Sequence, residues 1–127
     1  MYPMMLGLQQ LLGNGKIGSF ISAENQGWFI KDNNFMLDTA VLTSIHPNCT
    51  TDATSLPVVL LIVNSTGSSG EFLVMSFKGR KNTFYLGDKT AGYLTAVGSF
   101  PINDVAYMYL STGYGTDRRS NSTGYNQ

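Results

Sequence analysis

Two adjacent serines are the side chains of this sequence best placed to do chemistry. Ser68 and Ser69 stand in the segment Gly67–Glu71, which a short polar turn at residues 64–66 separates from the apolar run Pro57–Val63. A serine at the junction between a strand and a helix lies where free N–H groups and the helix dipole can stabilise an oxyanion. Because the flanking residues are small, a substrate carbonyl can approach the backbone, and the segment suits nucleophilic attack on that carbonyl.

The same segment also has a purely structural explanation. In a capping box, the Ser68 hydroxyl accepts from the N–H of Glu71, and the Glu71 carboxylate accepts from the N–H of Ser68. Capping boxes are common, so the spacing taken alone favours this explanation. The G-x-S-x-G elbow of the α/β-hydrolases is absent, because neither serine has glycine both two residues before and two residues after it.

The lone histidine suggests a metal site only weakly. His46 stands three residues before Cys49, the only cysteine of the chain. Two ligands are too few for a closed zinc site, and a single cysteine forms no internal disulfide. We therefore expect a solvated loop histidine, no metal and no cofactor. A role of His46 as general base for Ser68 is an alternative that the spacing does not favour.

Two further patterns have structural explanations. Residues 13–18 match G-x-G-x-x-G, but a dinucleotide site needs a strand before the glycines and a helix after them, and the expected order here is the reverse. We interpret this stretch as a helix end followed by a turn. Four cations form a cluster that we interpret as solvated surface near a helix C-terminus. They are Lys78, Arg80, Lys81 and Lys89.

The hydrophobic pattern predicts a mixed α/β chain. Apolar spacing indicates a helix over residues 2–12 and another over 68–78, and the run 57–63 is typical of a strand covered on both faces. With a strand at 83–86, residues 57–87 form a βαβ unit. Further strands are expected at 17–23, 28–30, 35–42 and 105–110. We also expect a loop at 43–55, Gly- and Thr-rich turns after residue 87, and a polar end from residue 112 that has few side chains to bury.

Composition bounds the class of protein. The 127 residues suffice for one domain, and 43% hydrophobic with 13% charged residues excludes a disordered chain. The formal net charge of zero disfavours nucleic-acid and membrane-surface partners. The apolar start at residues 1–12 is too short for a membrane span and lacks the flanks of a signal peptide. With 15 aromatic residues and no net charge, we expect a homo-oligomer.

Several motifs together resemble one family. The sequence from Pro57 to Glu71 is similar to the nucleophile segment of the tail-specific, carboxyl-terminal processing serine peptidases, which include the tricorn core and interphotoreceptor retinoid-binding protein. The resemblance continues through residues 82–93, similar to "N-T-x-x-x-G-x-x-T-x-G", and through 99–104, similar to "F-x-L-x-D-G". It also extends to Thr116–Arg118 and to the opening Met1–Met5, which is similar to the family's residues after a Gly-Gly-Asn turn.

The resemblance implies roles for individual residues. Ser68 aligns with the nucleophile of "T-x-S-x-x-E", and the N–H of Ser69 aligns with one oxyanion donor. The second donor is expected in the Gly-Gly-Asn turn, before Met1. Tyr93 stands where members with a Ser–Lys dyad carry the lysine, and other members take a histidine from an upstream segment. Residues 1–127 are therefore expected to be the C-terminal portion of a peptidase catalytic domain, weakly active or inactive alone.

The expected fold is α/β, of the ClpP/crotonase-like type that the resemblance implies, with the βαβ unit at 57–87 and flanking β-hairpins. The expected function is hydrolysis of a polypeptide substrate through Ser68 and Ser69. Two alternatives stay open: a non-catalytic peptide- or ligand-binding module on the same fold, and a structural domain in which Ser68 is only a cap. The family also implies an extracytoplasmic or membrane-associated full-length protein. We further expect copies to associate through Met4, Met5 or Leu8.

Overall fold

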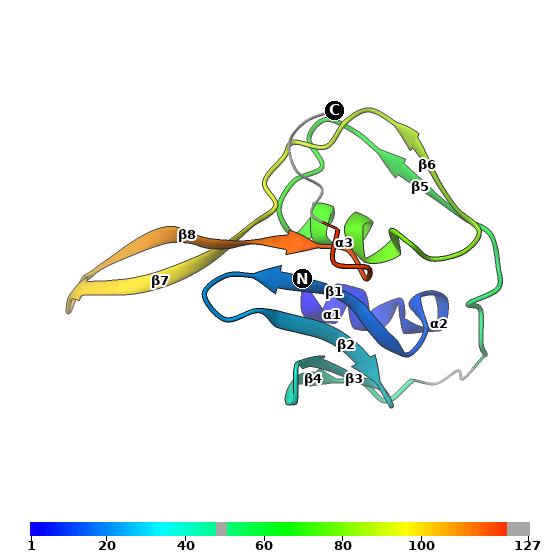
Figure 1. Cartoon of the computed structure of the whole chain (residues 1–127), viewed down its shortest axis with the longest axis horizontal. Helices are drawn as coiled ribbons and strands as arrows, with labels where there is room; N and C mark the ends of the chain where they lie inside the picture. Colours follow the sequence, from blue (N-terminus) through cyan, green and yellow to red (C-terminus); the bar gives the residue numbers. More distant parts are fainter. Residues whose placement is uncertain (48–50, 122–127) are drawn as a thin grey trace.

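The computed structural model describes residues 1–47 and 51–121 and contains three helices and eight strands in that part of the chain (Figure 1). The helices are α1 (Tyr2–Gly7), α2 (Gln9–Leu12) and α3 (Ser69–Phe77). The strands are β1 (Gly15–Ile21), β2 (Gln26–Lys31), β3 (Asn34–Leu37), β4 (Ala40–Ser44), β5 (Val58–Ile62), β6 (Thr83–Gly87), β7 (Thr95–Asn103) and β8 (Ala106–Thr116).

Six strands form one antiparallel sheet in the order β4-β3-β2-β1-β8-β7. β8 pairs with β1 only through its last residues, Tyr114 to Thr116. The rest of β8 pairs with β7 alone, so this hairpin projects as a long arm from the body of the molecule (Figure 1). Its strands and tip carry one charged side chain, Asp104.

The βαβ unit predicted from the sequence is present. β5 and β6 pair in parallel, with Val58 opposite Thr83 and Ile62 opposite Gly87, and α3 connects them. Figure 1 shows α3 between this two-stranded sheet and the six-stranded sheet. The helix therefore begins close to where β5 ends, as the apolar run followed by small residues predicted.

Aromatic rings fix α3 against the large sheet. Phe72 makes edge contacts with Phe20 and Trp28, with ring centroids 5.5 and 5.4 Å apart. Gly115 of β8 permits this contact, because a Cβ there would lie 2.5 Å from Phe72 Cε1 and 2.9 Å from Met75 Cε. The close approach of helix and sheet thus depends on a residue without a side chain.

The prediction that residues 57–63 are covered on both faces was wrong. One face of β5 packs on the core through Val58 and Leu60, but Val59 and Leu61 are 51% and 81% exposed. Their partners in β6, Phe84 and Leu86, are also more than half exposed. A continuous apolar run shows that both faces of a strand are hydrophobic. It does not show that other residues of the same chain pack against each face.

Other sequence predictions need correction. The helix predicted at 2–12 is two short helices, and the strand predicted at 35–42 is interrupted by the turn between β3 and β4. The region after residue 87, predicted to contain turns, includes the whole of β7. The predicted loop 43–55 begins inside β4. The end of the chain is not free of buried groups, since Thr116 and Asp117 are 1% and 2% exposed. Thr116 lies at the end of β8 and pairs with Ser19 of β1.

Candidate active site

Ser68 occupies a strained turn at the start of α3. It is the N-cap residue, with φ +50° and ψ −118°, and its side chain is exposed. A non-glycine residue rarely adopts this backbone conformation, which costs about 1–3 kcal/mol and persists where the surroundings enforce it. The sharp turn directs a serine outward between a strand and a helix, which is the geometry of a nucleophile elbow without its glycine pattern.

A buried carboxylate enforces the turn. Ser68 and Glu71 form the predicted capping box, in which Glu71 Oε2 accepts from the Ser68 N–H at 3.0 Å. The same carboxylate accepts from the N–H groups of Gly92 and Tyr93, each at 2.6 Å. Glu71 is only 2% exposed, so these three donors take the place of water around a buried charge.

The segment before β7 closes against the turn at two more points. The Ala91 N–H donates to the Thr66 carbonyl at 2.8 Å. The Tyr93 ring lies so close to Gly67 that a Cβ on that glycine would be 3.1 Å from Tyr93 Cδ2. A side chain at position 67 would therefore push the aromatic ring away from the turn at Ser68.

A backbone N–H group lies at the N-terminal end of α3, next to Ser68. Ser69 is the first residue of α3, so its N–H has no acceptor within the helix. Together with the helix dipole, this N–H can stabilise negative charge that develops beside Ser68. The turn thus combines an exposed hydroxyl with a free donor, as oxyanion chemistry requires.

The structure does not bring the histidine to this turn. His46 is exposed and follows β4, at the edge of the large sheet opposite to β7. Cys49, its proposed companion, lies outside the described residues. Among residues 1–47 and 51–121, no cluster of three or more His, Cys, Asp or Glu side chains could hold a metal ion. None of the helices in those residues has the length and apolar character needed to span a bilayer.

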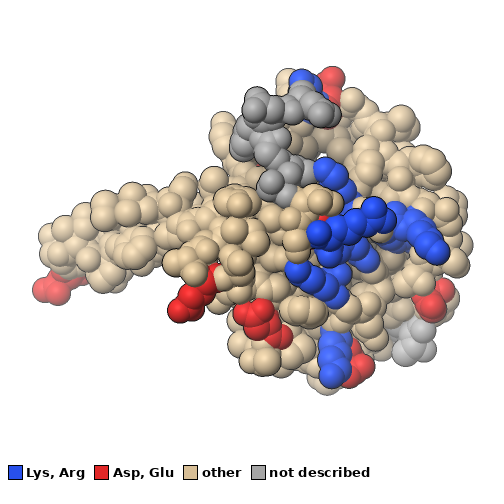
Figure 2. Space-filling view, in the orientation of Figure 1, with Lys and Arg blue, Asp and Glu red and all other residues tan. Residues whose placement is uncertain are grey.

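Figure 2 shows a group of basic side chains close together on one face of the molecule. Arg80, Lys81 and Arg118 line one cavity of about 880 Å³, and the side chain of Arg119 lies near Gly79. The prediction of a solvated cluster was wrong for Arg80. Its guanidinium donates to the carbonyls of Leu11, Thr54, Leu56 and Lys81 at 2.7–2.9 Å.

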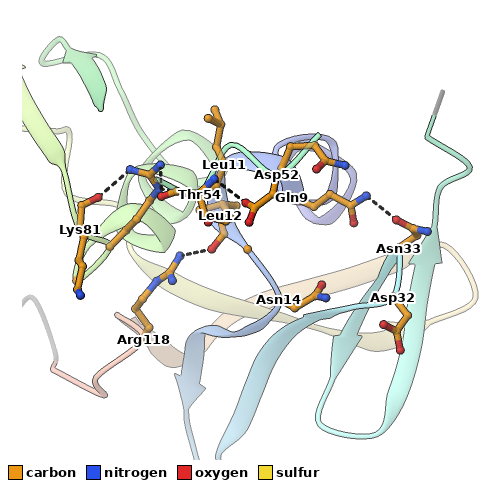
Figure 3. A pocket seen from close by; sticks show the side chains of 14 residues that line it. Gln9, Leu11, Leu12, Asn14, Asp32, Asn33, Asp52, Thr54, Lys81 and Arg118 are labelled. Atoms are coloured by element: carbon orange, nitrogen blue, oxygen red, sulfur yellow. Dashed lines mark hydrogen bonds between the residues drawn. The ribbon is translucent and has the colours of Figure 1, made fainter. Parts of the chain in front are cut away.

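Arg118 has a similar structural role beside that cavity (Figure 3). It donates to the carbonyls of Ser76 and Leu12, at the C-terminal ends of α3 and α2. Burial lowers the pKa of its guanidinium, and the charge of Arg80 lowers that pKa further. Neither Ser68 nor Ser69 lines the cavity, so we assign the two arginines to holding helix ends and loops together.

Comparison with known proteins shows the family of the chain. Residues 11–124 match the model of peptidase family S41. The chain belongs to peptidase family S41. It is 29% identical over 120 residues to the nisin-resistance protein of Lactococcus lactis subsp. lactis, an alignment that covers 94% of this chain and 37% of that relative.

Two solved structures resemble this S41 chain. A lipoprotein from Streptococcus agalactiae superposes with a TM-score of 0.67 at 28% identity, over 94% of this chain and 40% of the other. The photosystem II D1 C-terminal processing protease superposes with a TM-score of 0.61 at 13% identity, over 94% of this chain and 28% of the other, and so shows a shared fold. This S41 chain therefore spans well under half the length of these relatives.

Sequence reasoning missed the second function of Glu71. The spacing between Ser68 and Glu71 showed the capping box, but nothing in it indicated that the same carboxylate reaches Gly92 and Tyr93, more than twenty residues further along the chain. The only available signal was a glutamate in a segment that is otherwise small and apolar. Such a residue needs donors from elsewhere if it is buried.

Proposed function

We propose that this S41 chain carries the nucleophile of a serine peptidase, with Ser68 attacking the carbonyl carbon of a polypeptide. The observation that supports the proposal is the exposed Ser68 at φ +50°, held by Glu71 at the N-terminus of α3. Strain of this kind concentrates at sites where geometry matters for chemistry. Family membership supports the same reaction class.

The proposed step forms a bond between Ser68 Oγ and the carbonyl carbon. A base takes the hydroxyl proton and returns it to the leaving amine as the C–N bond breaks, and water then hydrolyses the acyl-enzyme. The Ser69 N–H donates to the oxyanion of the tetrahedral intermediate. The residues that the structure describes place no histidine at Ser68, so we propose that the base and a second oxyanion donor come from outside them.

The proposal extends to the fold type of the chain and to the location of the protein in the cell. We assign the chain to the C-terminal portion of a ClpP/crotonase-type catalytic domain, an assignment supported by the βαβ unit and by the S41 relatives. The Streptococcus agalactiae relative is named a lipoprotein, which supports action outside the cytoplasm, at a membrane.

A peptide hydrolysis assay tests the proposed function. We expect the purified chain to cleave casein slowly, because loss of one oxyanion donor alone reduces turnover by about 10²–10³ and loss of the base reduces it further. Ser68→Ala should abolish the slow cleavage. Ser69→Ala should retain it, because the proposed donor is the backbone N–H. Measurable cleavage at the same rate by wild type and Ser68→Ala would refute the proposal, and rapid cleavage by the wild type would restore His46 as a candidate base.

A further inference from the structure

We infer that Tyr93 is a specificity-determining residue, whose ring forms one wall of the substrate position beside Ser68 and selects an aromatic or large apolar side chain. The inference rests on the proposed function of Ser68. Tyr93 combines two features that rarely occur together. The residue is 67% exposed, but its backbone N–H is bound by the buried carboxylate of Glu71.

Glu71 places Tyr93 beside the nucleophile. A single oxygen, Glu71 Oε2, accepts from the Tyr93 N–H at 2.6 Å and from the Ser68 N–H at 3.0 Å. The two nitrogen atoms are therefore no further apart than those two distances together. The N–H of Gly92 donates to the other oxygen of the carboxylate at 2.6 Å and so gives this segment a second hydrogen bond to Glu71.

The direction of the ring is set by its contact with Gly67. Tyr93 Cδ2 lies 3.1 Å from the position of a Cβ on that glycine, so one edge of the ring lies beside the residue before Ser68. We expect a substrate whose carbonyl lies at Ser68 Oγ to contact this ring. Because the backbone of Tyr93 is held before the substrate arrives, only the ring loses conformational freedom on that contact.

The chemistry of the wall favours apolar partners. The charge of Glu71 is buried under three N–H donors, and the exposed surface beside it is an uncharged aromatic ring. An aromatic pair in offset or edge contact changes an equilibrium by a factor of about 2–12 beyond simple burial. A benzyl side chain next to the attacked carbonyl should therefore be preferred over a methyl side chain.

Covalent modification with two peptidyl phosphonate diphenyl esters tests the inference. One carries a benzyl side chain and the other a methyl side chain next to phosphorus. We expect the benzyl reagent to modify wild-type Ser68 about 5–10 times faster. Tyr93→Ala should reduce that ratio to about 1, and Tyr93→Phe should keep it. Tyr109→Ala, which removes a ring of similar exposure on the arm, is the matched control and should keep it too.

The outcomes separate this inference from the proposed function. If Ser68 is modified but Tyr93→Ala leaves the ratio unchanged while its circular dichroism spectrum matches wild type, the role of Tyr93 is refuted and that of Ser68 stands. If neither reagent modifies Ser68 in the wild type, the proposed function fails and this inference fails with it.

Discussion

At the scale of single residues, Glu71 explains how a serine keeps a strained backbone. One carboxylate satisfies the N–H of the N-cap residue and of two residues before β7. The capping box could be predicted from the sequence because it depends on local spacing. The contacts with Gly92 and Tyr93 could not, because they depend on how the chain returns after β6.

Glu71→Gln tests this explanation. The amide has one acceptor oxygen in place of two, so at least one partly buried N–H loses its acceptor and the remaining bonds lose their charge. We expect the free energy of unfolding to fall by about 2–4 kcal/mol. Urea denaturation followed by circular dichroism measures the change. Glu24→Gln is the control, since Glu24 is the other glutamate and is exposed, and it should change stability by less than about 0.5 kcal/mol.

A loss below about 0.5 kcal/mol in Glu71→Gln would show that the carboxylate does not hold the turn. The strain at Ser68 would then need another source.

At the scale of elements, the helices and strands that could be predicted are those with a clear hydrophobic period or a continuous apolar run. The β5–α3–β6 unit could be predicted from the run at 57–63 and the helical spacing after Ser68. β7 was missed because Gly98 and Pro101 interrupt its pattern. In the structure Gly98 pairs regularly with Leu110, and the register of the hairpin shifts after Pro101. The exposure of one face of β5 could not be predicted, since a cover is a property of tertiary packing.

Gly115→Ala tests the contact between β8 and α3. Its Cβ would meet Phe72 and Met75, both buried, at less than 3.0 Å, so the helix or the sheet must shift. We expect a loss of about 1–3 kcal/mol in the free energy of unfolding. Gly7→Ala is the matched control, because no atom lies within 4 Å of that Cβ and Gly7 is helical. It should be neutral or slightly stabilising.

Equal stability of the Gly115→Ala and Gly7→Ala variants would contradict the packing of Phe72 against β8. Thermal unfolding monitored in the near ultraviolet, where Trp28 and its neighbours absorb, would report the same comparison independently.

At the scale of the whole molecule, the surface is larger than a compact monomer requires. The accessible area is 8025 Å², whereas a globular protein of 13.8 kDa exposes about 6,600 Å². Much of the apolar surface lies on the arm and on the open face of β5 and β6. The expectation that Met5 lies in a contact between copies was wrong, because Met5 is fully buried in this chain, whereas Met4 is 46% exposed.

We propose that a second copy covers the open face of β5 and β6. A standard interface buries about 800 Å² on each partner, and the large apolar side chains Val59, Leu61, Phe84 and Leu86 are all more than half exposed on this face. Light scattering on a size-exclusion column should show a dimer or larger assembly over a tenfold concentration range. The double substitution Leu61→Lys and Phe84→Lys should shift it toward the monomer, and Met4→Lys should not. A wild-type peak at 13.8 kDa at all concentrations would contradict the proposal.

The most direct test of the central claim is to ask which serine of this chain reacts as a nucleophile. A fluorophosphonate reagent is incubated with the purified chain, and the modified residue is located by peptide mass spectrometry. The structure predicts slow modification confined to Ser68, abolished by Ser68→Ala and retained in Ser69→Ala. Modification of Ser69 or another serine in place of Ser68, or no modification at all, would contradict the assignment of Ser68 as the nucleophile.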